Sequence, residues 1–442
     1  MKDIFNKIDI HIQNNTILYI VGTISVLCWA LGLELVGLIF FVTLASYGLI
    51  RLENTLPVLT SFLFVPVIFK RHFTIADFNI WLLPAIGVFV IALIIHWIKF
   101  RPKLKQPKFI FGFLALIVAF ITMGIGSGKP FYFNYWLTSV GVIALLVVVY
   151  LFFNATLAKV DIKFFAKLFM TLGLVIFVQI AIYYATVDSF YFAIMRKSLH
   201  LGWAISNAIG TVLLFTIPIT AYLIISSKRN AFYIIATVLQ LVAMLFTFSR
   251  GAILALVIGA IPIIIYLYKY SYDRMKFIVK SEFIFIGIML LVVFLFGPLS
   301  EVLKFMVATG FDDRLRMEDY LLAWNNFLDF PIFGTNLYYL FEIKGKIYWY
   351  HNTLLQMASS MGLVGLLAML YHWFEKYRVI VKSFNPFNVF LTIALLMTEI
   401  HGLIDVTYFA VHFMIPLIAI LLIMEKNTTI NLEQPVLFDY TT

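Results

Sequence analysis

Charged residues are scarce in this chain. They make up 12% of its 442 residues, while 63% are hydrophobic. A soluble domain carries about 25% charged residues, so this composition excludes an ordinary soluble protein. The mean hydropathy is +1.00, and long apolar runs recur along the sequence. We therefore predict an integral membrane protein that crosses the bilayer many times.

Cysteine and cofactor motifs are also lacking. Cys28 is the only cysteine and lies in an apolar run, which excludes a disulfide framework. The sequence has no Walker loop, no dinucleotide fingerprint and no zinc-ligand spacing. The early outer loops carry no paired acidic residues, which a metal-dependent lipid-linked glycosyltransferase would need, and Glu34 stands alone there. We therefore expect no metal and no cofactor, so the substrate must supply the energy for any reaction.

The apolar runs indicate the fold class. We count about fourteen of them, and several are shorter than the ~20 residues of an ordinary span. The prediction is an all-α polytopic membrane protein with about 12–14 transmembrane helices, forming a single integral membrane domain over residues 1–442. Residues 1–15 are polar with mixed charge and are not expected to be a cleavable signal.

Lys and Arg are concentrated in short loops. The net charge is +10, which we attribute mainly to the cytoplasmic bias of basic loops rather than to nucleic-acid binding. Counting helices from the basic loop 99–108 places most basic loops on one face, which is then cytoplasmic. Lys70-Arg71 is an exception that this count places outside. The polar features around Arg250, 298–351 and 401–405 then share the outer face.

The longest polar stretch is 298–351, predicted to be a large extracytoplasmic loop that contains a short amphipathic helix. Helical periodicity over 314–330 places one set of side chains on a single stripe toward the membrane or a cavity: Arg316, Tyr320, Trp324 and Phe327. Arg314 falls on another face and is a weaker candidate. The alternative role for Arg316 is that of an interfacial anchor.

Arg250 and His351 are further candidates. Arg250 lies between two apolar segments with almost no loop, where an arginine is costly without an anionic partner or water. Its alternative role is snorkelling to headgroups. His351 precedes an apolar helix whose expected N-cap is Asn352. The partial positive charge of a helix N-terminus favours a neutral imidazole, which can act as a general base. The alternative is an interfacial histidine bonded to a carbonyl.

Residues around these candidates have open roles. Tyr348-Trp349-Tyr350 suit either an aromatic belt or stacking on sugar rings. Gly362 and Gly365 are expected to permit close helix packing. His401 and Asp405 are either a supporting pair or the polar ends of two short helices.

Three local patterns resemble the bacterial O-antigen ligase/polymerase family of membrane glycosyltransferases. They are Phe248-Ser249-Arg250-Gly251-Ala252; Arg316 followed by Trp324 and Pro331-Ile332-Phe333-Gly334; and His351-Asn352 with Leu355 and Gly362-Leu363-Val364-Gly365. They occur in the family's order and cover roughly residues 246–366. The resemblance implies an all-helical bundle with a large outer loop. It also implies transfer of a glycan from undecaprenyl diphosphate to an acceptor hydroxyl, without metal or nucleotide.

The resemblance also implies residue roles. Arg250 and Arg316 would hold the diphosphate and stabilise charge on the leaving group, and His351 would take the proton of the attacking hydroxyl. Further candidates for substrate binding lie around these three: Arg314, Tyr320, Trp324, Trp349, Tyr350, Asn352, His401 and Asp405. The implied partners are the lipid-linked donor and acceptor, the bilayer, a chain-length regulator and a flippase. The short 334–350 linker departs from longer-looped ligases and leaves acceptor recognition open.

Polymerase and ligase share these motifs. The composition leans toward Phe, Ile, Lys and Asn, as in low-GC genomes, many of which belong to bacteria without lipopolysaccharide. We therefore favour a polymerase of O-antigen or capsule repeat units in the bacterial cytoplasmic membrane, with its active site on the outer or periplasmic side. The alternative is a ligase that transfers glycan to lipid A core or to protein. A lipid-linked oligosaccharide flippase is a weaker alternative, because the middle of most spans lacks charge.

Overall fold

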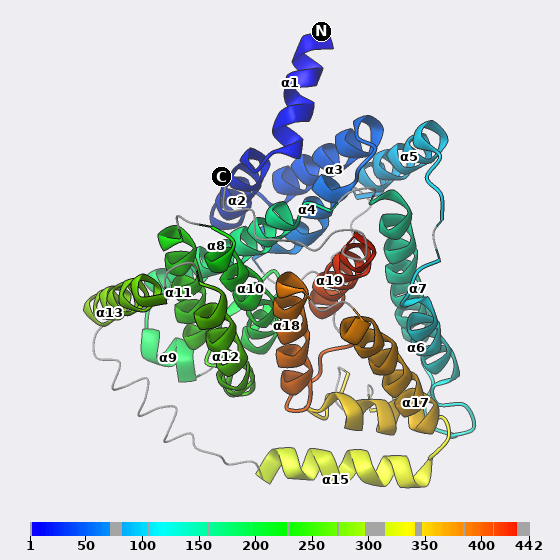
Figure 1. The fold of residues 1–442 in the computed structure, drawn as a ribbon. Coiled ribbons are helices and arrows are strands. Elements are labelled where there is room, and N and C mark those ends of the chain that lie inside the picture. The colour runs from blue at the N-terminus through cyan, green and yellow to red at the C-terminus, as the bar shows by residue number, and fades with distance from the viewer. Residues whose placement is uncertain are drawn as a thin grey trace.

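A computed structural model of the chain describes residues 2–70, 82–104, 106–157, 160–195, 197–227, 230–271, 274–296, 314–340, 347–382, 385–409 and 411–430. The described residues form helices and one two-stranded hairpin (Figure 1). The elements are α1 (Lys2–Gln13), α2 (Thr16–Leu31), α3 (Glu34–Arg51), α4 (Leu56–Phe64), the 3-10 helix η1 (Val65–Ile68), α5 (Leu82–Phe100), α6 (Ile110–Thr122), α7 (Phe133–Thr156), α8 (Ile162–Thr186), α9 (Phe190–Met195), β1 (His200–Leu201), β2 (Ala204–Ile205), α10 (Ser206–Ile225), α11 (Ala231–Phe246), α12 (Arg250–Tyr270), α13 (Arg274–Phe296), α15 (Arg314–Asp329), α17 (Thr353–Lys382), α18 (Pro386–Gly402) and α19 (Val411–Ile430). The predicted all-α polytopic class is confirmed.

Six described helices are long and apolar enough to cross a membrane, and α1 with α2 makes a seventh if that pair, bent by 79°, is one span. The six are α3, α7, α8, α10, α12 and α17. Other predicted segments form shorter apolar helices, such as Ile110–Thr122 and Ala231–Phe246, or run into residues outside the described part of the chain. The count of 12–14 spans therefore stays a prediction.

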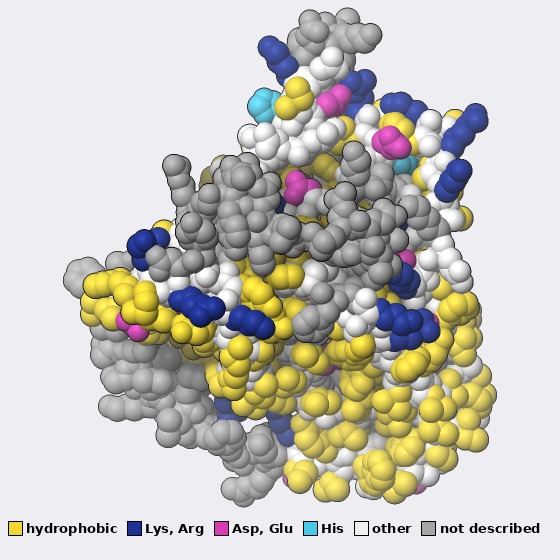
Figure 2. Space-filling model, in the orientation of Figure 1, with side chains coloured by type: hydrophobic (Ala, Val, Ile, Leu, Met, Phe, Trp, Pro, Cys, Tyr) yellow, Lys and Arg dark blue, Asp and Glu magenta, His cyan; other side chains and the backbone are white. Residues whose placement is uncertain are grey.

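Helix α10 is the central element of the bundle. In its most apolar window, 94% of the residues are buried, and its neighbours are α8, α11, α12 and α18. Many apolar side chains on the peripheral helices are exposed instead, for example Val148, Ile261 and Phe283. In Figure 2 the surface at the lower right is largely yellow for this reason. Such a surface is suited to contact with lipid tails.

Helix α15 lies across one end of the bundle, beneath α17 and at the end opposite α1 (Figure 1). It is the helix predicted within the polar loop, and its bounds are within one residue of the predicted 314–330. The described residues of the 298–351 loop are 314–340 and 347–351.

Helix α17 is broken at Gly362, which has φ 63° and ψ −151°, a backbone conformation that is essentially restricted to glycine. The break divides α17 into a short part next to α15 and a longer part that runs into the bundle. The expectation that Gly362 serves close packing within a continuous helix was therefore incomplete, because a pattern of small residues does not reveal a change in the sign of φ.

The turn after α15 fills the break in α17. Pro331 O accepts from Leu363 N at 2.7 Å, and Thr335 N donates to Ser359 O at 2.8 Å. These bonds satisfy backbone groups that the break removes from the helix, as an apolar environment requires. A Cβ at Gly362 would lie 2.4 Å from the carbonyl carbon of Ile332, so the turn and the helix meet backbone to backbone.

A buried ionic cluster ties α17 to α18 and to the segment after it. Lys376 Nζ donates to Glu399 Oε1 and, at 2.8 Å, to the Tyr408 hydroxyl, which itself contacts Glu399 at 2.6 Å. Lys376 is fully buried, and removing one member of a buried pair costs about 3–5 kcal/mol. The cluster therefore fixes the ends of α17 and α18 relative to each other.

Candidate active site

Arg316 faces the protein from the first turn of α15. Its Nη1 lies 3.4 Å from the carbonyl oxygen of Ile404, in the segment after α18. Tyr320, one turn later, donates from its hydroxyl to the carbonyl of His351 at 3.4 Å. The inward face of α15 therefore carries polar side chains to the start of α17.

Trp324 does not share this inward stripe, and the predicted stripe is wrong at this position. The Trp324 side chain is 48% exposed and packs on Phe327 with ring centroids 5.5 Å apart. Eight residues turn a helix by two full turns and about 80° more, so Trp324 is rotated away from Arg316. It lies on a neighbouring apolar face whose other exposed members are Met317, Leu321 and Leu328.

Buried aromatic and amide side chains hold α15 in place. Asn326 Nδ2 donates to the Tyr350 hydroxyl at 2.9 Å and to Ser359 Oγ at 3.3 Å. Tyr350 is 1% exposed, so its ring packs inside the protein and not on an accessible surface. Tyr348 donates to Asp319, and this bond, with burial and the Asp319 charge, raises the pKa of Tyr348 to about 12. These contacts fix the position of α15 along its axis and its rotation about that axis, and therefore the position of Arg316.

His351 occupies a special backbone position, with φ 50°, two residues before the start of α17. Asn352 caps that helix as predicted, because its Oδ1 accepts from Leu355 N at 3.0 Å. Its Nδ2 donates to Leu403 O at 2.8 Å. Asn352 thus serves both the helix end and the segment that follows α18.

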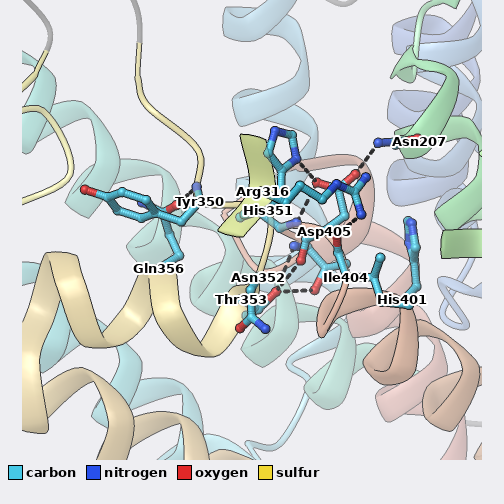
Figure 3. Close-up of polar contacts among 12 residues, drawn as sticks. Asn207, Arg316, Tyr350, His351, Asn352, Thr353, Gln356, His401, Ile404 and Asp405 are labelled. Atoms are coloured by element: carbon cyan, nitrogen blue, oxygen red, sulfur yellow. Dashed lines mark hydrogen bonds and ion pairs between the residues drawn. The ribbon is translucent and has the colours of Figure 1, made fainter. Parts of the chain in front are cut away.

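Asp405 is the carboxylate that His351 meets (Figure 3). His351 Nδ1 lies 3.3 Å from Asp405 Oδ1, which also accepts from Val406 N at 2.8 Å. A carboxylate only accepts, so this bond places the imidazole proton on Nδ1 and leaves the lone pair on Nε2. The His351 side chain is 40% exposed, so part of the side chain is accessible from outside the protein.

Asn207 and Thr211 complete this cluster from the first turns of α10. Asn207 Nδ2 donates to Asp405 Oδ2, and Thr211 Oγ1 lies 3.0 Å from His401 Nδ1. His401 is 2% exposed, and its carbonyl accepts from Asp405 N at 2.9 Å. His401 and Asp405 therefore belong to one supporting network, and sequence reasoning missed Asn207 and Thr211.

The ionisation of Asp405 follows from these contacts. Burial by itself raises the pKa of the carboxyl. The His351 hydrogen bond, the charges of both histidines and the Val406 amide outweigh that, and the pKa falls below the usual 3.8. Asp405 is therefore a carboxylate across the neutral range.

Arg250 begins α12 after a tight turn in which Phe248 has φ 51°. Close packing joins this turn to α10, because a Cβ at Gly210 would lie 2.8 Å from Ala252 Cβ. Arg250 thus starts its helix beside the first turns of α10, which carry Asn207 and Thr211. Figure 2 shows dark-blue Lys and Arg side chains in the lower part of the surface, below α12 and toward the start of α15.

Two other candidate residues, Trp349 and Arg314, have no described polar contact with this cluster. Trp349 is half-buried and packs on Phe409 with ring centroids 6.0 Å apart. The Arg314 side chain lies outside the described part of the structure.

Among the described residues, no group of three or more His, Cys, Asp or Glu side chains is arranged to hold a metal ion.

The arrangement has the groups that a transfer to a hydroxyl needs. An imidazole held by a carboxylate can take a proton, and guanidinium groups can stabilise an anionic leaving group.

The family model described as O-antigen ligase matches residues 235–370, which include Arg250, Arg316 and His351. No curated protein matches the chain.

Proposed function

We propose, from the match of residues 235–370 to the O-antigen ligase family model, that the chain is a member of the O-antigen ligase/polymerase family and a polymerase of lipid-linked repeat units. The donor and the acceptor would both be oligosaccharides on undecaprenyl diphosphate, and the product an O-antigen or capsular polysaccharide. The observation that carries the proposal is the position of His351 relative to Arg316. His351 contacts Asp405, and Arg316 contacts the carbonyl of the preceding residue, Ile404.

Chemically, the acceptor hydroxyl attacks the anomeric carbon of the donor glycan. His351 Nε2 takes the hydroxyl proton as the new glycosidic bond forms, and Asp405 stabilises the charge that the imidazole gains. The bond from the anomeric carbon to the diphosphate breaks, and its electron pair leaves with undecaprenyl diphosphate. Arg316 and Arg250 stabilise that anion, and the planar fork of arginine suits phosphate oxygens.

Two sequence features favour polymerisation over ligation. The low-GC composition suits a cell without lipid A core, and the short linker 334–350 offers little chain for recognising a large core acceptor. We also propose that the reaction needs no added metal or nucleotide, and that the site faces outward across the cytoplasmic membrane. A ligase would use the same residues and differ in its acceptor.

The test uses purified protein in nanodiscs with a defined undecaprenyl-diphosphate-linked repeat unit. Polymerase activity yields a ladder of products, without nucleotide and in excess chelator. Addition of lipid A core separates the alternatives, because a ligase modifies that acceptor and forms no ladder. A protein that forms neither product but moves the lipid between leaflets would be a flippase. His351→Ala is the matched inactive control.

A further inference from the structure

The segment between α9 and α10 brings another cation to the candidate site. Lys197 closes α9 in a tight turn with φ 47°, in which its amide donates to Ile194 O at 2.9 Å. Ser198 N donates to Ala193 O at 3.0 Å, which fixes the next residue of the turn. Ten residues after Lys197, Asn207 contacts Asp405. The segment that begins at Lys197 therefore leads, through Asn207, to the carboxylate beside His351.

Packing holds this segment firmly on both sides. The ring of Phe190 in α9 lies 6.2 Å from that of Phe246, just before the turn that leads into Arg250. Beyond Lys197, the hairpin side chains Leu201 and Trp203 are buried. A Cβ at Gly202 would lie 1.6 Å from Pro66 O, so the hairpin tip sits directly on the end of η1.

The charges around Lys197 are mostly of its own sign. The surrounding protein desolvates its ammonium and lowers the pKa of this group, although solvent reaches the side chain. The nearby positive charges of Arg250 and Arg316 lower it further, and Asp405 opposes them. Within the described residues, Lys197 Nζ has no hydrogen-bond or ion-pair partner, and Asp405 is already engaged by His351 and Asn207. Like charges at close range repel one another, so an anion that binds among these three cations is favoured.

We propose that Lys197 is a third phosphate-binding cation, which contacts the lipid diphosphate together with Arg250 and Arg316. This assignment rests on the proposed function and adds to it. A diphosphate presents more charge and more oxygen atoms than two guanidinium groups can satisfy. A lysine ammonium is a compact donor that can bind the remaining oxygens as a point charge. Lys197 is then a substrate-binding residue supplied from outside the matched 235–370 region.

The test measures binding of undecaprenyl diphosphate, without sugar, to the full-length protein in zwitterionic nanodiscs. Lys197→Gln should weaken binding roughly tenfold or more, as expected for the loss of one charged contact, and Lys197→Arg should recover much of that loss. Lys129→Gln is the matched control, since Lys129 is also exposed and stacks on Phe330 at 5.4 Å, and it should bind within about twofold of wild type. A thermal melt in the same nanodiscs checks folding.

Three results would overturn the assignment. These are unchanged binding by Lys197→Gln, an equal loss in Lys129→Gln, or no recovery in Lys197→Arg. A separate arm adds phosphatidylglycerol to the nanodiscs. If Lys197 served phospholipid headgroups instead, its substitution would weaken association with that lipid and leave diphosphate binding unchanged. If the wild type did not bind the diphosphate lipid at all, the proposed function would fail together with this inference.

Discussion

His351 Nδ1 lies 3.3 Å from Asp405 Oδ1, although the two residues are 54 positions apart. The contact joins the segment before α17 to the segment after α18. It fixes the ring in the tautomer that leaves the lone pair on Nε2, and Asn207 holds the carboxylate from its other side. Geometry of this kind gives each residue a distinct expected effect on activity.

His351→Ala should remove most turnover and leave donor binding largely intact. General-base catalysis typically contributes 10²–10⁴-fold, so the loss should be of that order. The measurement is polymer yield and donor affinity on matched amounts of purified protein. A variant with near-normal yield would end the catalytic assignment of His351.

Arg316→Ala should both weaken donor binding and slow the chemistry, because its charge meets the diphosphate before and during bond cleavage. Arg316→Lys should restore only part of the activity, since an ammonium lacks the planar fork. If Arg316→Lys behaves as wild type, the residue is an interfacial anchor. Kinetics at varied donor concentration separate the two roles.

Asp405→Asn should lower turnover by about tenfold or more without changing donor affinity, because the imidazole loses its charge partner. The same variant tests stability. The folded-state pKa of Asp405 is below the usual 3.8, so its contribution to stability is fully present above about pH 3.8 and is lost as pH falls through the folded value. The gap in melting temperature between wild type and variant should therefore narrow as the pH falls below about 3.8. A gap that widens in acid would contradict the assignment.

Gly362→Ala should sharply reduce folded protein in the membrane. Alanine at this φ and ψ is strained by about 1–3 kcal/mol, and its Cβ would also collide with the backbone of Ile332. Gly126→Ala is the matched control, with φ 75° but no atom within 4 Å of the added Cβ. Thermal melts of both variants measure the difference, and equal stability would show that the turn does not constrain α17.

A cysteine at Asn325 should react with an impermeant thiol reagent in intact cells, or in spheroplasts where an outer membrane blocks access. A cysteine at Lys103 should react only after permeabilisation. Both positions are exposed, and the native Cys28 is buried, so background labelling should be low. The reverse pattern would invert the topology and place the candidate site in the cytoplasm.

Local patterns in the sequence predicted the elements better than their contacts. Periodicity located α15, and the Asn352 cap followed from residue type and position. The same periodicity misplaced Trp324, because a face defined by successive turns drifts along the helix. Asn207 and Lys197 could not be found in this way. They reach the site through the fold, from a segment about 150 residues before His351 that carries no periodic or motif signal.

The paired backbone of the turn after α15 also restrains the two described parts of the polar loop, 314–340 and 347–351. Thr335 and Asn336 are locked to the broken helix, and Tyr348 and Tyr350 are locked to α15 and α17. Arg316 and His351 therefore keep their positions relative to each other through these contacts of the described residues.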